Sequence, residues 1–264
     1  YHIYAKNPNA NVLVTPADHL ILQEDAFDEA ICRSLDYVKA HPKLVTLGVR
    51  PSRPETGYGY IQFTDIEDEH FVKVKTFTEK PNIEMAKVFY ESGEFLWNSG
   101  MFAWNVQTIL DAFHQYLPSL TSILDEVKGA YATDEEQSRV SQVFSECPNI
   151  SIDYAVLEKA DNVMVLPVDF GWADLGTWGS LYELKREEPR ANVSLHTKAL
   201  FYEAEGNIVS LDGDPEKQLV VVQGINDCIV AQSKGVLLIC KRDEEQRIKE
   251  FMGEASVQFD KKFD

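Results

Sequence analysis

The chain has 264 residues, 44% of them hydrophobic and 26% charged, which is typical of a globular protein with one large domain or a large and a small one. A net charge of -18 argues against nucleic-acid binding through phosphates, so any phosphate site must reverse the sign locally with a metal ion or a few Lys and Arg residues. The sequence has no apolar run long enough to span a membrane and no secretory signal, and its four cysteines include no CxxC pair. It therefore predicts a cytoplasmic protein with buried free thiols.

The first fifty residues alternate between strand and helix patterns. A helix end and a turn occupy residues 1–10, and the apolar, β-branched run 11–15 predicts a buried strand. Residues 23–40 carry an apolar stripe at helical spacing, and residues 44–49 form a second buried strand. This strand-helix-strand order predicts parallel pairing of the two strands in a three-layer α/β sheet.

The middle of the chain mixes a hairpin with helices. Two alternating runs around an acidic turn at 65–70 predict the hairpin, and two aromatic strands are expected on either side of residues 98–100. The hairpin strands are 58–64 and 71–77, and the aromatic strands are 95–97 and 101–104. The expected helices are 82–91, 105–116, 119–130, 134–145 and 153–159, followed by a buried strand at 163–168 and a helix at 178–186.

From residue 192 onward the sequence pattern changes to short runs that are rich in strand-forming residues. Their regular spacing and Gly and Asn/Asp turns predict a small β-solenoid or β-sandwich. The runs are 199–203, 207–211, 218–222, 227–232 and 236–240, with a terminal helix at 243–252. We place the domain boundary near 188–192, which gives one domain at 1–190 and a second at 191–264.

Two aspartates lie beside predicted strand ends, where open α/β sheets bind ligands. Asp18 follows the first strand and could reach a metal ion or a phosphate, although its position alone favours a turn or N-cap role. Asp174 lies between two glycines in the segment 171–178 and could be the second carboxylate of a hard cation such as Mg²⁺. The alternative for this segment is that Thr177 caps the next helix and the tryptophans are core.

A second group of polar residues and glycines lies around the hairpin. Glu79 could accept hydrogen bonds from sugar hydroxyls and Lys80 could offset the charge of a phosphate, or both could be an exposed pair without a role. Gly59 could bring backbone amides against a ligand, and Asn98 could bind a sugar hydroxyl, or each could serve only its turn. The sequence has no GxSxG, HExxH, P-loop or GxGxxG motif, so nothing local supports a Ser-His-Asp nucleophile.

Taken in order, these segments are more specific than any one alone. PADH, RPETGYGYI, FTEKP, WNSGMF, SIDYAVLEK and GWADLGTW together resemble the mannose-1-phosphate guanylyltransferase family. EKP and WxDxGT alone would indicate only the sugar nucleotidyltransferase superfamily, whereas PADH, WNSGMF and SIDYAVLEK point to its mannose/GDP branch. The resemblance covers about residues 11–184 and, more weakly, the β-rich tail.

The resemblance implies a fold and a set of site residues. The fold would be a Rossmann-like nucleotide-diphospho-sugar transferase (GT-A-like) three-layer sandwich, followed by a small left-handed β-helix. Asp18 and Asp174 match the Mg²⁺ ligands, and Lys80 matches the residue that holds the sugar phosphate. Glu79 matches a residue that holds sugar hydroxyls, and Gly59 and Asn98 match sugar-contacting positions. Asp153 lies in a family motif, but its role is not assigned.

The implied reaction transfers GMP from GTP to mannose 1-phosphate, forming GDP-mannose and pyrophosphate. The attacking phosphate oxygen is already an anion, so catalysis needs positioning and charge neutralisation rather than a general base. The alternatives are another sugar-1-phosphate nucleotidyltransferase (glucose-1-phosphate thymidylyl or uridylyl transfer) and a non-catalytic sugar-phosphate-binding regulatory subunit. The expected partners are GTP and mannose 1-phosphate, without nucleic acid or membrane, and a homodimer is plausible.

One family feature is absent from these residues. The family opens with a glycine-rich loop of the type GGxGxRLxPxS…PK, which wraps the nucleotide triphosphate and governs the choice of base. We therefore expect the chain to be part of a longer protein, incomplete in its N-terminal β-α units, and to catalyse poorly alone.

Overall fold

Two units of the chain each have their own core in the computed structural model, which describes residues 1–66 and 70–259. The first unit comprises Tyr1–Ala17 and Ile21–Trp172, and the second comprises Asp18–Leu20 and the residues from Ala173 onward. The middle of the acidic turn expected at 65–70 lies outside the described residues.

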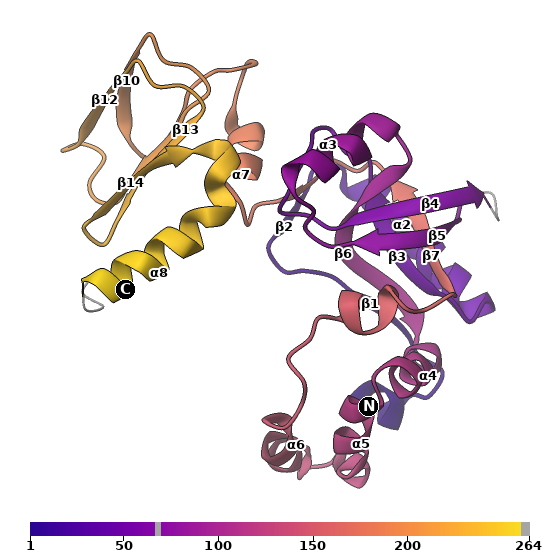
Figure 1. Cartoon of the computed structure of the whole chain (residues 1–264). Coiled ribbons are helices and arrows are strands. Elements are labelled where there is room, and N and C mark those ends of the chain that lie inside the picture. Colours follow the sequence, from indigo (N-terminus) through magenta and orange to yellow (C-terminus); the bar gives the residue numbers. More distant parts are fainter. Residues whose placement is uncertain (67–69, 260–264) are drawn as a thin grey trace. The chain divides into compact units, whose positions relative to one another are not determined.

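A six-stranded mixed sheet forms the centre of the first unit (Figure 1). Its strands run in the order β1-β6-β3-β7-β5-β4, with β3 and β7 parallel and β6 antiparallel to both β1 and β3. The strands are β1 Asn11–Val14, β3 Leu44–Val49, β4 Tyr60–Ile66, β5 Val72–Thr78, β6 Phe95–Asn105 and β7 Val163–Val168.

Strand β6 separates two strands that the sequence analysis paired with each other. Trp104 of β6 lies opposite Val12 of β1 on one side and Leu44 of β3 on the other. The expected direct parallel pairing of β1 with β3 is therefore wrong, although both run antiparallel to the strand between them. An apolar pattern shows that a strand is buried, but it does not name the strand's neighbours.

Strand β6 is also continuous where a break was expected at residues 98–100. Gly100 adopts a left-handed backbone with φ +70°, and the register against β3 shifts between Thr46 and Gly48. The hydroxyl of Ser99 donates to the Leu47 carbonyl over 2.7 Å, which ties the irregular stretch to β3. Glycine reaches this conformation without a Cβ clash, so the chain absorbs an irregularity instead of ending the strand.

Helices cover both faces of this sheet because neighbouring strand residues point to opposite sides. Val45 packs in one core cluster with Ala30 and Val38 of α2 (Glu24–Ala40), close to the predicted helix. Leu44 packs in another with Ile109 of α4 (Val106–Tyr116). Next to α4 lie α1 (His2–Lys6) and α5 (Pro118–Asp125), and α6 (Glu136–Phe144) lies beside α5 (Figure 1). These layers make the predicted three-layer α/β arrangement.

Helix α3 (Ile83–Ser92) and two single helical turns complete the described part of the first unit. The helix starts at Asn82, whose side chain accepts a hydrogen bond from the Met85 amide, and it ends at left-handed Gly93. The helix expected at 119–130 is split into α5 and the 3-10 turn η1 (Lys128–Ala130), and the one expected at 153–159 is the π-helical turn η2 (Asp153–Leu157). The aromatic residues of β6 are core, as the sequence indicated.

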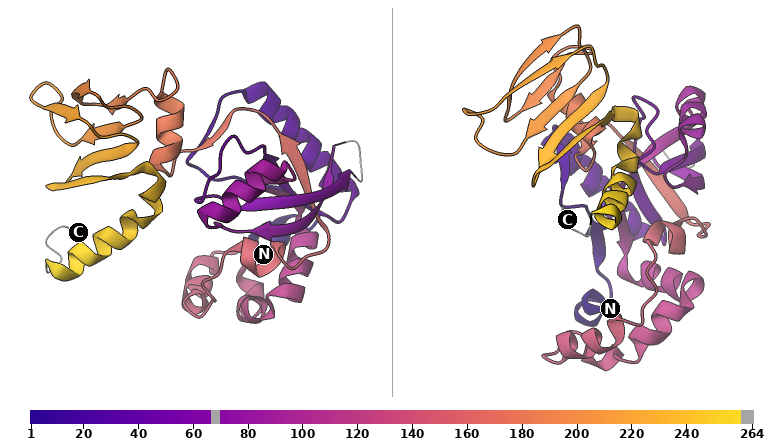
Figure 2. Two further views of the ribbon diagram at one scale, coloured as in Figure 1. Left: turned by 45° about the horizontal axis from the view of Figure 1, so that its top comes forward. Right: turned by 60° about the vertical axis from the view of Figure 1, so that its left-hand side comes forward.

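The second unit contains two small sheets and a terminal helix (Figure 2). Strands β9, β11 and β13 are parallel neighbours, β10 and β12 form a parallel pair, and β14 is antiparallel to β13, so the larger sheet is mixed. The strands are β9 Val193–Leu195, β10 Lys198–Tyr202, β11 Ile208–Leu211, β12 Leu219–Gln223, β13 Cys228–Ser233 and β14 Val236–Lys241. The chain then continues through η3 (Arg242–Arg247) into α8 (Ile248–Gln258).

Helix α7 (Trp178–Lys185) belongs to this second unit, although the sequence analysis placed it before the domain boundary. Its Tyr182 is buried against Val193, Ile208 and Ile229. The compact units divide between Trp172 and Ala173, and the domain boundary near 188–192 stays a prediction. The physical reason is that Tyr182 of α7 packs against Val193, Ile208 and Ile229, which all follow it in the chain.

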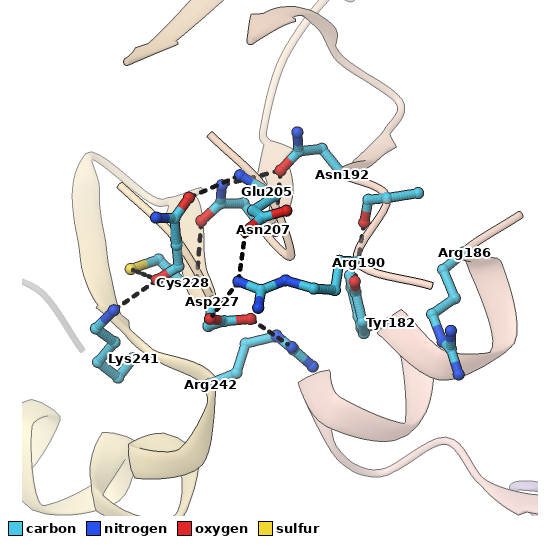
Figure 3. Close-up of polar contacts among 12 residues, drawn as sticks. Tyr182, Arg186, Arg190, Asn192, Glu205, Asn207, Asp227, Cys228, Lys241 and Arg242 are labelled. Atoms are coloured by element: carbon cyan, nitrogen blue, oxygen red, sulfur yellow. Dashed lines mark hydrogen bonds and ion pairs between the residues drawn. The ribbon is translucent and has the colours of Figure 1, made fainter. Parts of the chain in front are cut away.

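Buried polar contacts tie successive strands of the second unit together (Figure 3). Asn207 is fully buried; its side-chain nitrogen donates to Asn192 Oδ1, and its oxygen accepts from the Cys228 amide. Nearby, Arg242 lies over the Tyr182 ring and pairs with Asp227. Both ends of the Asn207 amide are hydrogen-bonded, as a buried polar group needs, whereas Arg242 Nε is buried without a hydrogen-bond partner among the described residues.

The four cysteines are free, as expected. Cys228 is buried, but Cys32 is exposed on α2, which corrects the expectation that all four are buried. Within the described residues, no helix combines the length and apolar character that crossing a bilayer requires.

Candidate functional site

Pairing of β4 with both β5 and β6 brings the predicted sugar-contacting residues together in the first unit. Tyr60 lies opposite Thr78 of β5 and opposite Trp97 of β6. Three sequence-distant segments meet as a result: the residue before β4, the residues after β5 and the irregular stretch of β6. They carry Gly59, Glu79, Lys80 and Asn98.

Gly59 lies at this meeting point, where an added side chain would press on two neighbouring residues. A Cβ there would lie closer than van der Waals contact to Glu79 Oε2 and 3.3 Å from the Asn98 Cβ. The Asn98 amide also donates to the Gly59 carbonyl over 2.8 Å. The glycine therefore serves close approach of three segments rather than a special backbone angle.

Glu79 and Lys80 form a half-buried carboxylate beside an exposed ammonium. The Glu79 side chain is 19% exposed and that of Lys80 62%, with 3.6 Å between Lys80 Nζ and Glu79 Oε1. Burial, assisted by the charge of Asp153, raises the pKa of Glu79 above its ordinary value, against the opposing effect of Lys80. Lys80 has φ +47°, a costly conformation for a non-glycine residue and one that is common at functional sites.

Asn98 is held at both ends of its side-chain amide. The nitrogen donates to Asp153 Oδ1 over 2.8 Å, and the oxygen accepts from the Gly100 amide at 3.2 Å and the Thr46 hydroxyl at 3.3 Å. Sequence analysis named Asn98 but gave no role to Asp153 and did not single out Thr46. The only signal for Asp153 was its place in the SIDYAVLEK segment, since 55 residues separate it from Asn98.

The two aspartates predicted as metal ligands lie in the second unit, beside a pair of strands that the sequence did not reveal. Strands β2 (His19–Ile21) and β8 (Trp172–Asp174) pair with each other, and each has only three residues. His19 Nε2 lies 4.0 Å from Asp174 Oδ1, which sets the start of β2 against the end of β8. Asp18, the residue before β2, is exposed on this pair.

Asp174 also stabilises the turn before α7, and Thr177 caps that helix, as the alternative for this segment predicted. Asp174 Oδ1 accepts the Gly176 amide over 2.7 Å, and Thr177 caps α7 by accepting from the Ser180 amide over 3.1 Å. The Asp174 side chain nevertheless stays 26% exposed. A carboxylate oriented by a backbone amide can serve a turn and a cation together.

The donor set fits a hard cation that keeps other ligands. Asp18 and Asp174 offer carboxylate oxygens from the beginning of one short strand and the end of the next. In the described part of the chain, no group of three or more His, Cys, Asp or Glu residues is placed to hold a metal ion. Two protein carboxylates, with water and phosphate oxygens completing the shell, are the usual pattern for Mg²⁺.

Comparison with known proteins relates the chain to one enzyme class. A family model described as nucleotidyl transferase matches residues 2–190. The chain is 37% identical over 243 residues to the mannose-1-phosphate guanylyltransferase of Escherichia coli strain K12, an alignment that covers 90% of this chain and 50% of the relative. It is 36% identical to the one of Salmonella typhimurium, over 90% of this chain and 49% of that relative.

A solved structure supports the same assignment. It is the mannose-1-phosphate geranyltransferase from Thermus thermophilus, which aligns with a TM-score of 0.81 and 29% identity over 97% of this chain and 72% of that one. The predicted nucleotidyltransferase-type α/β fold is thereby confirmed. The chain spans about half the length of the curated relatives it matches.

Proposed function

Since the chain belongs to the nucleotidyl transferase family, we propose that it acts in transfer of GMP from GTP to mannose 1-phosphate, forming GDP-mannose and pyrophosphate. One observation carries the proposal: Gly59, Glu79, Lys80 and Asn98 meet in a single cluster. Its carboxylate, amide and ammonium suit a ligand that has both hydroxyls and a phosphate. The names of the similar proteins supply the mannose.

Within the cluster, each side chain has a distinct task. Glu79 accepts hydrogen bonds from sugar hydroxyls, and Asn98 donates one through its side-chain nitrogen. Lys80 places its ammonium against the phosphate of mannose 1-phosphate and offsets part of its charge. Because that phosphate is the nucleophile and is already anionic, holding it in line with the α-phosphorus of GTP is the main requirement.

The aspartate pair would hold a Mg²⁺ ion. Bound Mg²⁺ supplies positive charge against phosphate oxygens, which a chain of net charge -18 otherwise repels. Asp18 would contribute an exposed carboxylate. Asp174 would contribute the carboxylate that the Gly176 amide already orients. A catalytic histidine or serine is not needed in this scheme.

For the second unit we propose a short left-handed β-helix closed by a hairpin. The parallel registers of β9, β11 and β13, and of β10 and β12, support strands stacked in successive coils. Residues with a left-handed backbone, such as Gly206 and Gly224, support tight turns between successive strands. Antiparallel β14 would end the stack.

The proposal is tested by incubating the complete protein with Mg²⁺ and each pairing of a nucleoside triphosphate with a sugar 1-phosphate, and measuring pyrophosphate release. Sugar-phosphate binding is measured in parallel by calorimetry. We expect GTP with mannose 1-phosphate to be preferred. Preference for glucose 1-phosphate with dTTP or UTP would instead assign a sister enzyme. Binding of mannose 1-phosphate without turnover in any pairing would favour the regulatory sugar-phosphate-binding protein, and absence of both would contradict the proposal.

Two variants separate the contributions of the two groups of residues. Lys80→Ala should weaken binding of mannose 1-phosphate more than that of GTP, and an equal effect on both would argue against its phosphate role. Asp174→Ala should lower turnover by orders of magnitude while the thermal unfolding midpoint stays close to that of the parent. If Asp174→Ala kept a rate close to that of the parent in the presence of Mg²⁺, the assignment of Asp174 as a metal ligand would be wrong.

A further inference from the structure

Asp153 connects to the sugar cluster through Asn98 without being part of the predicted site. It is the first residue of η2, a π-helical turn that follows the helical region of the first unit, whereas Asn98 lies in the middle of β6. The 2.8 Å contact between Asp153 Oδ1 and Asn98 Nδ2 links these two elements. Both side chains are half-buried, so water screens the contact only partly.

The surroundings of Asn98 leave its amide one favourable orientation. On one side, Asp153 offers a carboxylate, which can only accept hydrogen bonds. On the other, the Gly100 amide donates, and the Thr46 hydroxyl lies at hydrogen-bond distance from both Asn98 Oδ1 and the Met101 carbonyl. A flipped side chain would put Asn98 Oδ1 against the carboxylate and its nitrogen against the Gly100 N–H, and both contacts would be repulsive. Asp153 and the Gly100 amide therefore both favour the orientation in which Asn98 Nδ2 is the donor at this place.

This orientation determines what the cluster can recognise. An amide nitrogen has two hydrogens, and one of them is committed to Asp153. No described residue takes the second, which leaves it for a ligand acceptor. The Asn98 backbone amide is hydrogen-bonded to Gly59, and Glu79 Oε2 lies where a Gly59 side chain would begin, so a fixed donor and a fixed acceptor lie next to each other. A sugar hydroxyl accepts from the first and donates to the second.

We propose that Asp153 is a positioning residue that locks Asn98 as a hydrogen-bond donor and so sets the hydroxyl specificity of the sugar-phosphate site. The inference rests on the proposed function for the identity of the ligand, but its first part, the locking of Asn98, does not. Asp153 acts through Asn98 and contacts no reacting atom in this scheme. The charge of Asp153 also acts on two other carboxyl groups. Burial raises the pKa of Glu79 and that of Glu158, and the negative charge of Asp153 adds to both shifts.

Binding measurements with three variants test the proposal. Asp153→Ala removes the acceptor, Asp153→Asn keeps an oxygen but removes the charge and allows the amide to flip, and Glu158→Gln is the matched control. Glu158 also faces Glu79 and Asp153 electrostatically, yet it makes no side-chain contact with Asn98 among the described residues. Calorimetry then gives the dissociation constant of each for mannose 1-phosphate.

We expect Asp153→Ala to weaken binding about tenfold, as loss of one hydrogen bond to a charged group does. Asp153→Asn should weaken binding by less than Asp153→Ala does. The dissociation constant of Glu158→Gln should stay within about twofold of that of the parent. With monodeoxy analogues of mannose 1-phosphate, the penalty of Asp153→Ala should disappear for the analogue lacking the hydroxyl that Asn98 binds. A merely structural role would give the same penalty with every analogue, and that result would overturn the proposal.

A ligand-free measurement separates this inference from the proposed function. The side-chain amide of Asn98, assigned with Asn98→Asp, is followed by nitrogen NMR relaxation. Its order parameter should fall in Asp153→Ala and stay unchanged in Glu158→Gln. If the parent binds no mannose 1-phosphate, the proposed function fails while a fall in the order parameter still supports the locking of Asn98. An unchanged order parameter in Asp153→Ala would overturn the locking whatever the ligand.

Discussion

At the scale of single residues, the sugar cluster depends on small and fixed groups rather than on strongly reactive ones. Gly59 leaves space for the Glu79 carboxylate, and Lys80, with a left-handed backbone, follows Glu79 directly. The side-chain amide of Asn98 is hydrogen-bonded to Asp153 and to Thr46. None of these residues is a nucleophile or a general base. This agrees with a reaction whose attacking oxygen is already ionised.

Gly59→Ala should damage this cluster directly. The added Cβ would lie against the Glu79 carboxylate and close to the Asn98 Cβ, so one of the two side chains must move. We expect affinity for mannose 1-phosphate to fall by about tenfold or more, because misplacing one binding group already has that cost. Gly129→Ala is the control in the same unit, since a Cβ there meets nothing within 4 Å. Equal binding by both variants in calorimetry would contradict the close-approach argument.

At the scale of elements, short strands and capped helices carry the aspartates of the second unit. Strand β8 ends at Asp174, and α7 begins four residues later, directly after the Thr177 cap. The same few residues therefore end a strand, make a turn and start a helix. A carboxylate in such a segment gains its orientation from backbone amides rather than from side-chain packing.

Thr177→Ala should destabilise α7 by about 1 kcal/mol, the usual cost of losing an N-cap side chain. The hydroxyl oxygen of Thr177 accepts from the Ser180 amide, and alanine leaves that amide without its partner. Thr177→Ser keeps the oxygen and should stay close to the parent. Chemical denaturation followed by circular dichroism measures the difference. The cap assignment would be wrong if serine and alanine cost the same.

At the scale of the whole molecule, one sequence builds two separate cores. The first unit is built on clusters around β3, β6 and β7, and the second on clusters around β11 and β13. Because each unit buries its own apolar residues, damage to one core should be felt mainly inside that unit.

Paired core substitutions check this separation. Gly48→Ala places a Cβ 2.5 Å from Val165 Cγ2 and 2.7 Å from Leu96 Cδ1, an overpacking that costs about 1–3 kcal/mol. Ile229→Ala empties a fully buried position in the other unit at a cost of about 2–5 kcal/mol. Hydrogen-exchange mass spectrometry should show faster exchange in β3, β6 and β7 for the first and in β9–β14 for the second. Acceleration across both units by either variant would contradict independent cores.

The sequence by itself determined the buried strands, the long helices and most of the residues of the sugar cluster. Residues 44–49 and 163–168 were predicted with their observed bounds, and helix α2 within one residue, because apolar periodicity over several residues is a local signal. Motifs in the sequence named Glu79, Lys80 and Asn98 as candidate site residues. Nothing in the sequence showed that a small residue at Gly59 leaves space for the Glu79 side chain.

Only the tertiary structure decided which segments meet. It inserted β6 between β1 and β3, kept that strand continuous through Gly100, assigned α7 to the second unit and gave Asp153 a partner in Asn98. Strands β2 and β8 were missed because three residues cannot display a period. Pairing and hydrogen bonding between distant segments depend on the free energy of the whole packed arrangement, which no local pattern records.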